Sequence, residues 1–180
     1  MNSSDLISKA YRKEQERLHR DPAGYGMKGK KWADHVHTRA AQYGVTDAIL
    51  DYGCGRNSLC AELSARGLKT RSYDPAIKQF AALPKASDMV VCCDVLEHVE
   101  PEKLEFVLTH LVELTRVVGF FVVSVVETAK TLSDGRQAHI SLHPREWWIA
   151  KLKERFRVVE VINDPDYKPE KQLIVTVVPK

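Results

Sequence analysis

A short apolar segment that runs into a pair of glycines constrains this chain more than any other feature. Residues Ala48–Tyr52 are mostly apolar, and Gly53, Cys54 and Gly55 follow them directly. This pattern predicts a buried strand, a tight turn and then a helix, because glycine lets the backbone turn sharply and approach a ligand closely. Free backbone N–H groups at the start of the helix are expected to face the same space. The segment therefore predicts a ligand-binding turn.

The residues after this turn extend it into a βαβ unit. A helix is predicted over Ser58–Arg66 and a second strand over Leu68–Tyr73, with Asp74 at its end. Asp74 lies 23 positions beyond Asp51. An acidic residue at the carboxyl end of the second strand can accept hydrogen bonds from both ribose hydroxyls of a nucleoside. The unit therefore indicates a nucleoside-binding α/β sheet.

A third predicted strand places another acid at the same edge of the sheet. It covers Asp88–Asp94, so Asp51, Asp74 and Asp94 each stand at or near the carboxyl end of a strand. Ligands of parallel α/β sheets bind beyond these ends. The three carboxylates are therefore predicted to line one ligand site.

Three motifs in this order resemble the cofactor motifs of class I S-adenosylmethionine-dependent methyltransferases, most closely those of the small methyltransferase type 11 branch. The motifs are Asp51-Tyr52-Gly53-Cys54-Gly55, Tyr73-Asp74 and Cys93-Asp94-Val95-Leu96-Glu97-His98-Val99. The resemblance covers residues 43–125, with a weaker likeness in the last two predicted strands. Asn57 stands where the family often has a third glycine, and asparagine tolerates a left-handed backbone better than most residues.

The resemblance implies S-adenosylmethionine as cofactor and assigns roles to residues of the three motifs. Gly53–Gly55 would support its amino-acid part, Asp74 its ribose, and Asp94 with the two residues after it the methyl and adenine side. Near the amino terminus, Lys28 or Lys30 of a glycine-containing turn can meet the cofactor carboxylate, although a plain interhelical turn is an equal alternative. The predicted cofactor-binding residues are Asp51, Gly53, Cys54, Gly55, Asp74, Pro75, Asp94, Val95, Leu96, Tyr25 and Lys30.

The length of 180 residues suits one domain, a methyltransferase domain over residues 1–180. Two helices are predicted before the sheet, from Ser3 or Ser4 to His19 and over Lys28–Tyr43. They are free to pack over the cofactor cleft. We therefore expect a helical lid in residues 1–45 and a sheet core in residues 46–180.

The resemblance implies a Rossmann-like α/β fold with a mostly parallel twisted sheet, and the spacing of the segments modifies it. Asp74 to Ser87 spans 14 residues, which is too short for a helix, a strand and a second helix. We predict that one outer strand is missing and that Leu68–Tyr73 forms one edge. Further strands are predicted over Phe120–Val126, Val158–Ile162 and Gln172–Val178, the last antiparallel to the rest and paired with its predecessor as a hairpin at the other edge.

The acceptor is expected beneath the loop Glu127–His143, closed by the amino-terminal helices and by Trp147 or Trp148. Methyl transfer depends mainly on orientation and desolvation, and it needs a base only if the acceptor must lose a proton. His139 and His98 are the predicted catalytic residues, with Glu97 behind them. A solvent-facing position at the start of a helix is an equal alternative for His98.

Charge, cysteine spacing and hydropathy limit the kinds of partner that the chain is expected to bind. The net charge is only +3, and the densest basic stretch, Lys28-Gly29-Lys30-Lys31, is short, so nucleic acid is not favoured. The four cysteines lack zinc-ligand spacing and are expected to be free thiols, and no metal site is predicted. No signal peptide or membrane-spanning run is evident, which predicts a cytoplasmic protein without a membrane partner.

The predicted function is the transfer of a methyl group from S-adenosylmethionine to an oxygen or nitrogen of a small polar acceptor. A hydride-transferring dehydrogenase is disfavoured because the turn lacks the Gly-x-Gly-x-x-Gly pattern. Two alternatives stay open at this stage: a non-catalytic, regulatory S-adenosylmethionine-binding protein, and a methyltransferase acting on RNA or protein. The identity of the acceptor and the oligomeric state stay open as well.

Overall fold

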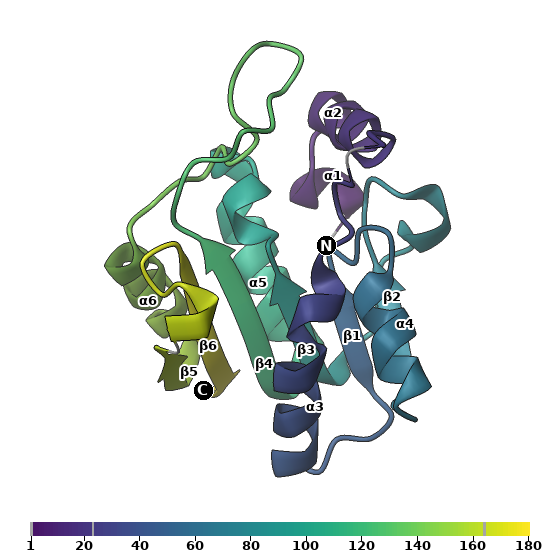
Figure 1. Cartoon of the computed structure of the whole chain (residues 1–180), viewed down its shortest axis with the longest axis vertical. Coiled ribbons are helices and arrows are strands. Elements are labelled where there is room, and N and C mark those ends of the chain that lie inside the picture. Colours follow the sequence, from purple (N-terminus) through teal and green to yellow (C-terminus); the bar gives the residue numbers. More distant parts are fainter. Residues whose placement is uncertain (1, 23, 164) are drawn as a thin grey trace.

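A computed structural model describes residues 2–22, 24–163 and 165–180. In these ranges a six-stranded sheet lies between two layers of helices (Figure 1). The strands are β1 Ile49–Tyr52, β2 Thr70–Tyr73, β3 Ser87–Cys93, β4 Thr115–Ser124, β5 Phe156–Ile162 and β6 Gln172–Pro179. The helices are α1 Ser3–Leu6, α2 Lys9–His19, α3 Ala33–Gln42, α4 Ser58–Ala65, α5 Leu104–Leu114 and α6 Arg145–Lys153.

The strand order is β2-β1-β3-β4-β6-β5. Strands β2, β1, β3 and β4 pair in parallel, whereas β6 is antiparallel to both β4 and β5. Between β2 and β3 the chain forms only a short 3₁₀ turn, Lys78–Phe80. The predicted α/β fold, its antiparallel last strand, its missing outer strand and both of its edges are therefore confirmed.

Side chains that alternate along the strands pack against the helix layers on the two faces of the sheet. In β3, Met89 and Val91 face the layer that contains α3 and α4, while Val90 and Cys92 face α5 and α6. All four side chains are fully buried. Successive side chains of a strand point to opposite faces, so a continuous apolar run suits a sheet that is covered on both sides.

Several element boundaries differ from the sequence-based expectations. The first predicted helix divides into α1 and α2, because Ile7 is extended and the Ser8 hydroxyl caps α2 by accepting a hydrogen bond from the Tyr11 N–H at 3.1 Å. The second begins as a 3₁₀ turn, Gly29–Trp32, before α3. Strand β4 begins at Thr115, opposite Ser87 of β3, earlier than its apolar run suggests.

The strand order reverses at β1: β2 is added on one side of this strand, and β3 and the later strands are added on the other. Helices α1 and α2 and the loop between β4 and α6 lie at the end of the sheet where β3 and β4 finish (Figure 1). Helix α3 instead packs beside the sheet in the same apolar cluster as α4. Ligands of such sheets bind beyond the carboxyl ends of the strands at the reversal. None of the helices in the described ranges is long and apolar enough to cross a membrane.

Candidate active site

The glycine-rich turn after β1 is packed so tightly that side chains do not fit. Gly53 has φ +76°, and a Cβ on it would lie 2.3 Å from Cγ2 of Val95, which follows β3. Gly55 has φ +52°, and its Cβ would lie 2.5 Å from the carbonyl oxygen of Gly26. Glycine is thus required at both positions for backbone conformation and for close approach.

The N–H groups of Gly53 to Asn57, which lead into α4, all have partners within the protein. The N–H groups of Gly53 and Cys54 both donate to the Tyr73 carbonyl, at 2.7 and 3.0 Å, and that of Gly55 donates to Asp74. The two that follow donate to the carbonyls of Gly26 and Cys54. The turn can therefore contact a ligand through its close-packed backbone surface, because these backbone N–H groups already donate hydrogen bonds within the protein.

Asn57 adopts the left-handed conformation expected for it, with φ 64° and ψ 24°. Its side-chain Oδ1 accepts a hydrogen bond from the Ser72 hydroxyl at 2.6 Å. This contact ties the start of α4 to β2, so the turn keeps its course without a third glycine.

A cavity of about 410 Å³ lies beyond the carboxyl ends of the strands. This volume falls within the ~300–1,000 Å³ range of small-molecule sites. The cavity joins the glycine-rich turn to the β4–α6 loop, and α1 and α2 form part of its wall. Its lining includes predicted site residues from both halves of the cleft: Asp51, Gly53, Cys54, Gly55, Asp74, Pro75, Asp94, Val95, Tyr25, His98 and His139.

Two carboxylates at the ends of β1 and β2 are buried at this cavity. Burial, with the nearby charge of Asp74, raises the pKa of Asp51 to about 7. Burial also raises the pKa of Asp74, although His19 and the N–H groups of Ala76 and Gly55 oppose the shift. In the described part of the chain, neither carboxylate forms an ion pair with a lysine or arginine, so a ligand that carries a positive charge would be stabilised here.

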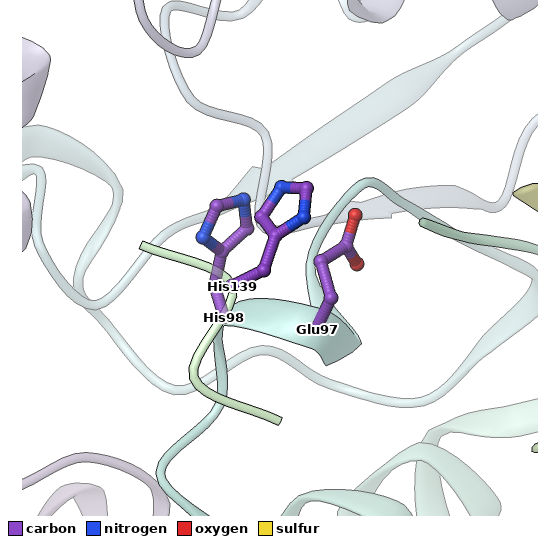
Figure 2. A group of neighbouring side chains, drawn as sticks. All are labelled: Glu97, His98 and His139. Carbon is purple, nitrogen blue, oxygen red and sulfur yellow. The ribbon is translucent and has the colours of Figure 1, made fainter. Parts of the chain in front are cut away.

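At the other half of the cavity the side chains of Glu97, His98 and His139 lie beside one another (Figure 2). The His98 Nδ1 is 2.8 Å from the Ala138 carbonyl, and the His139 Nδ1 is 2.7 Å from the Val126 carbonyl. Burial lowers the pKa of both imidazoles, that of His98 to about 3, and raises the pKa of Glu97. The three groups are therefore favoured in their neutral forms in a site without a ligand.

Residues 23–160 match the family model described as a methyltransferase domain. The match covers more than half of the 180 residues. The chain belongs to this methyltransferase family. The expected assignment to the methyltransferases is therefore confirmed. No curated protein matches the sequence significantly.

Solved methyltransferase structures share the fold at low sequence identity. The 1,6-didemethyltoxoflavin-N1-methyltransferase of Burkholderia thailandensis, with 1,6-didemethyltoxoflavin and S-adenosylhomocysteine bound, has a TM-score of 0.60 at 19% identity, over 87% of this chain and 79% of that one. The N-methyltransferase NodS of Bradyrhizobium japonicum, with S-adenosylhomocysteine, has a TM-score of 0.61 at 15% identity, over 94% and 98%. Magnesium protoporphyrin IX methyltransferase of Synechocystis, with S-adenosylmethionine, has a TM-score of 0.58 at 18% identity, over 96% and 92%.

Two residues predicted to bind the cofactor lie away from the cavity of this methyltransferase. Leu96 is fully buried in the core beneath α5, and Lys30 is exposed. Lys28, the other lysine predicted for this role, does line the cavity, and so does Lys31, whose Nζ is 3.2 Å from Oδ2 of Asp94. The 3₁₀ turn at Gly29–Trp32 decides which lysine points inward, because it rotates successive side chains differently from an α-helix.

The expected role of the tryptophans is also wrong. Among the described residues, neither Trp147 nor Trp148 lines the cavity. Trp148 is fully buried in the core, and Trp147 stacks on His143 with ring centroids 3.7 Å apart. Helix α6 packs against β5 and β6, so its aromatic side chains contribute to that side of the sheet. The cavity wall near His139 comes from Val126, Thr128 and Lys130 of the loop.

The amino-terminal segment supplies site residues that sequence reasoning missed. These residues are His19, whose Nε2 lies 3.7 Å from Oδ2 of Asp74, and Gln15, which accepts a hydrogen bond at 2.8 Å from the hydroxyl of the predicted residue Tyr25. The Arg56 guanidinium donates to the carbonyls of His19 and Asp21, which fastens the end of α2 to the glycine-rich turn. An apolar stripe along α2 indicates that it packs on something, but only the fold shows that this is the cavity.

Proposed function

We propose that this methyltransferase transfers a methyl group to an oxygen or nitrogen of a small polar acceptor. The observation that carries the proposal is the cavity itself, which connects the glycine-rich turn and Asp74 to Glu97, His98 and His139. One end suits a nucleoside-containing cofactor, and the other presents polar groups for an acceptor. The two compounds would meet within one enclosed space, as methyl transfer requires.

The residues at the cofactor end fit S-adenosylmethionine. Asp51 lines the cavity, and within the described ranges its carboxylate accepts a hydrogen bond only from the Cys60 thiol, at 3.8 Å. The carboxylate can therefore also accept from the cofactor ammonium group. Asp74 already accepts two backbone N–H groups, yet a carboxylate offers about four lone-pair sites, which leaves capacity for the ribose hydroxyls. When bound, S-adenosylmethionine supplies a methyl group made electrophilic by the sulfonium.

The remaining residues would orient the acceptor and exclude water. Residues 1–180 would form one methyltransferase domain, in which α1 and α2 serve as the lid, whereas α3 supports the sheet. His139 and His98 would position the acceptor or take up its proton, since a carbonyl bond at Nδ1 leaves the lone pair on Nε2. Tyr25 would hold the lid against His98, because its hydroxyl lies 3.3 Å from that Nδ1.

The presence of α1 and α2 in the cavity wall favours a small acceptor over RNA or a folded protein. The toxoflavin precursor and the protoporphyrin named with two of the similar structures are small molecules as well. These compounds support a small-molecule acceptor, whose identity is to be found by experiment.

The proposal is tested with S-adenosylmethionine that carries an isotopically labelled methyl group. Purified protein is incubated with a small-molecule extract, with total RNA or with a protein fraction, and the labelled products are identified by mass spectrometry. We expect label in the small-molecule fraction only. Label in RNA or protein would support the macromolecular alternative. Calorimetric binding of S-adenosylhomocysteine without any labelled product would support a non-catalytic, regulatory protein.

A further inference from the structure

Three side chains at the acceptor end of the cavity form a cluster with metal-ligand chemistry. Glu97 and His98 end the 3₁₀ turn after β3, and His139 comes from the β4–α6 loop. One carboxylate oxygen and one nitrogen from each imidazole all lie within 4.8 Å of one another (Figure 2). The spacing of the four cysteines predicted no metal site, and none of these three ligands is a cysteine.

Each imidazole is held as a ligand would be. A carbonyl oxygen can only accept, so the contacts to Ala138 and Val126 place the ring proton on Nδ1 of His98 and of His139. The lone pair is then on Nε2 in both rings. Metal-binding histidines almost always donate their other ring N–H to a carbonyl or carboxylate, which fixes the tautomer and the ring orientation.

The carboxylate of Glu97 provides a second, independent observation. Its side chain is fully buried, and Oε1 accepts a hydrogen bond from the Ser124 N–H at 3.1 Å. In the described part of the chain, Oε2 has no hydrogen-bond partner. A buried polar atom without a partner costs free energy, and a bound cation would remove that cost.

We propose that Glu97, His98 and His139 bind one divalent first-row transition-metal ion. Two imidazoles and one carboxylate suit Zn²⁺, Co²⁺ or Fe²⁺ better than Ca²⁺ or Mg²⁺, which prefer oxygen ligands. Asp94 adds negative charge close enough to act on both Glu97 and His139. All three ligand residues line the cavity, so the free coordination positions would face the acceptor.

This inference rests on the proposed function, and it narrows the acceptor from an oxygen or nitrogen compound to a hydroxyl compound. A metal with three protein ligands can hold an acceptor oxygen and lower the pKa of its hydroxyl group. The acceptor would then be a hydroxyl compound, with the oxygen bound beside the cofactor methyl group. Because Nε2 of both histidines would hold the metal, the proton released by the hydroxyl would pass to water and not to His98 or His139. The acceptor oxygen would form a bond to the methyl carbon as the bond from that carbon to the cofactor sulfur breaks, and S-adenosylhomocysteine would leave.

The test uses tag-free protein freed of metal with a chelator and titrated with Co²⁺. Calorimetry gives the stoichiometry, and the visible absorption of Co²⁺ reports its ligands. We expect one Co²⁺ per chain, competed by Zn²⁺. Glu97→Gln and His139→Ala should each weaken binding by at least about tenfold, because even indirect metal contacts contribute that much. His37→Ala, at an exposed position of α3, is the matched control and should bind as wild type does.

The same preparations are titrated with S-adenosylhomocysteine, so that failure of this inference differs from failure of the proposed function. Binding of S-adenosylhomocysteine without stoichiometric Co²⁺ would overturn the metal site and leave the methyltransferase proposal standing. Co²⁺ binding that survives both Glu97→Gln and His139→Ala would also overturn it. Stoichiometric, cluster-dependent Co²⁺ binding supports the site even if S-adenosylhomocysteine does not bind.

Discussion

The backbone N–H of Gly55 donates a hydrogen bond to Oδ2 of Asp74 at 3.0 Å, which joins the glycine-rich turn to the end of β2. The N–H of Ala76 holds the other carboxylate oxygen at 2.9 Å. Two fixed donors orient the Asp74 side chain before any ligand arrives. The carboxylate is thus preorganised for the ribose hydroxyls, which reduces the entropy lost on binding.

Replacement of Asp74 by alanine should weaken binding of S-adenosylhomocysteine by about 1.5–3 kcal/mol, the value of charge-assisted hydrogen bonds. Isothermal titration calorimetry measures the change, and circular dichroism checks the fold. Asp88→Ala is the control, because Asp88 lies at the opposite end of β3 and pairs only loosely with Arg116 at 3.7 Å. An Asp74→Ala protein that is folded and binds with wild-type affinity would contradict the assignment.

Gly53→Ala should destabilise the fold through both strain and overlap. Gly67→Ala separates the two effects, because Gly67 has φ +83° with open space around its missing Cβ, whereas Gly53 faces Val95. We expect about 1–2 kcal/mol for the strained backbone in both variants and about 1–3 kcal/mol more at Gly53. Urea unfolding measures each free energy. Equal losses in the two variants would show that the contact with Val95 does not matter.

Asp51 should make stability fall as the pH rises. Its pKa is about 7 in the folded protein and about 3.9 when unfolded. Between these values the folded state binds more protons than the unfolded state, so the free energy of unfolding decreases with pH, by at most ~1.4 kcal/mol per pH unit. Asp51→Asn cannot ionise there and should remove this contribution.

The measurement is urea unfolding of wild type and Asp51→Asn at several pH values between about 5 and 8. The variant should gain stability relative to wild type as the pH rises. Asp47→Asn is the control, because the Asp47 side chain is 64% exposed and should leave the slope unchanged. Parallel pH profiles for wild type and Asp51→Asn would show that Asp51 titrates normally.

His139→Ala should reduce methyl transfer while the affinity for S-adenosylhomocysteine stays at its wild-type value. A lost proton acceptor costs about 10²- to 10⁴-fold in rate, and a lost positioning contact costs less. Labelled-methyl assays give the rate once the acceptor is identified, and calorimetry gives the affinity. His37→Ala again serves as the control. Loss of cofactor binding in a folded His139→Ala protein would move this residue to the other half of the cavity.

Local patterns in the sequence determined the architecture. The 14-residue span from Asp74 to Ser87 excludes an extra strand, and each predicted strand overlaps a strand of the sheet, although β4 begins five residues before its predicted segment. The left-handed conformation at Asn57 and the glycines at positions 53 and 55 were likewise predictable, because backbone conformation depends on neighbouring residues.

Only the tertiary structure decided which side chains share the cavity. The contact of His19 with Asp74 joins residues 55 positions apart, and His139 meets Glu97 only because the β4–α6 loop folds back over β3. Lys31 lines the cavity and Lys30 does not, because successive residues of the 3₁₀ turn Gly29–Trp32 are rotated by about 120°. Trp147 and Trp148 lie away from the cavity, near the β5 edge of the sheet, because α6 packs on β5 and β6. Such contacts depend on how whole elements pack, and short-range sequence patterns do not encode that packing.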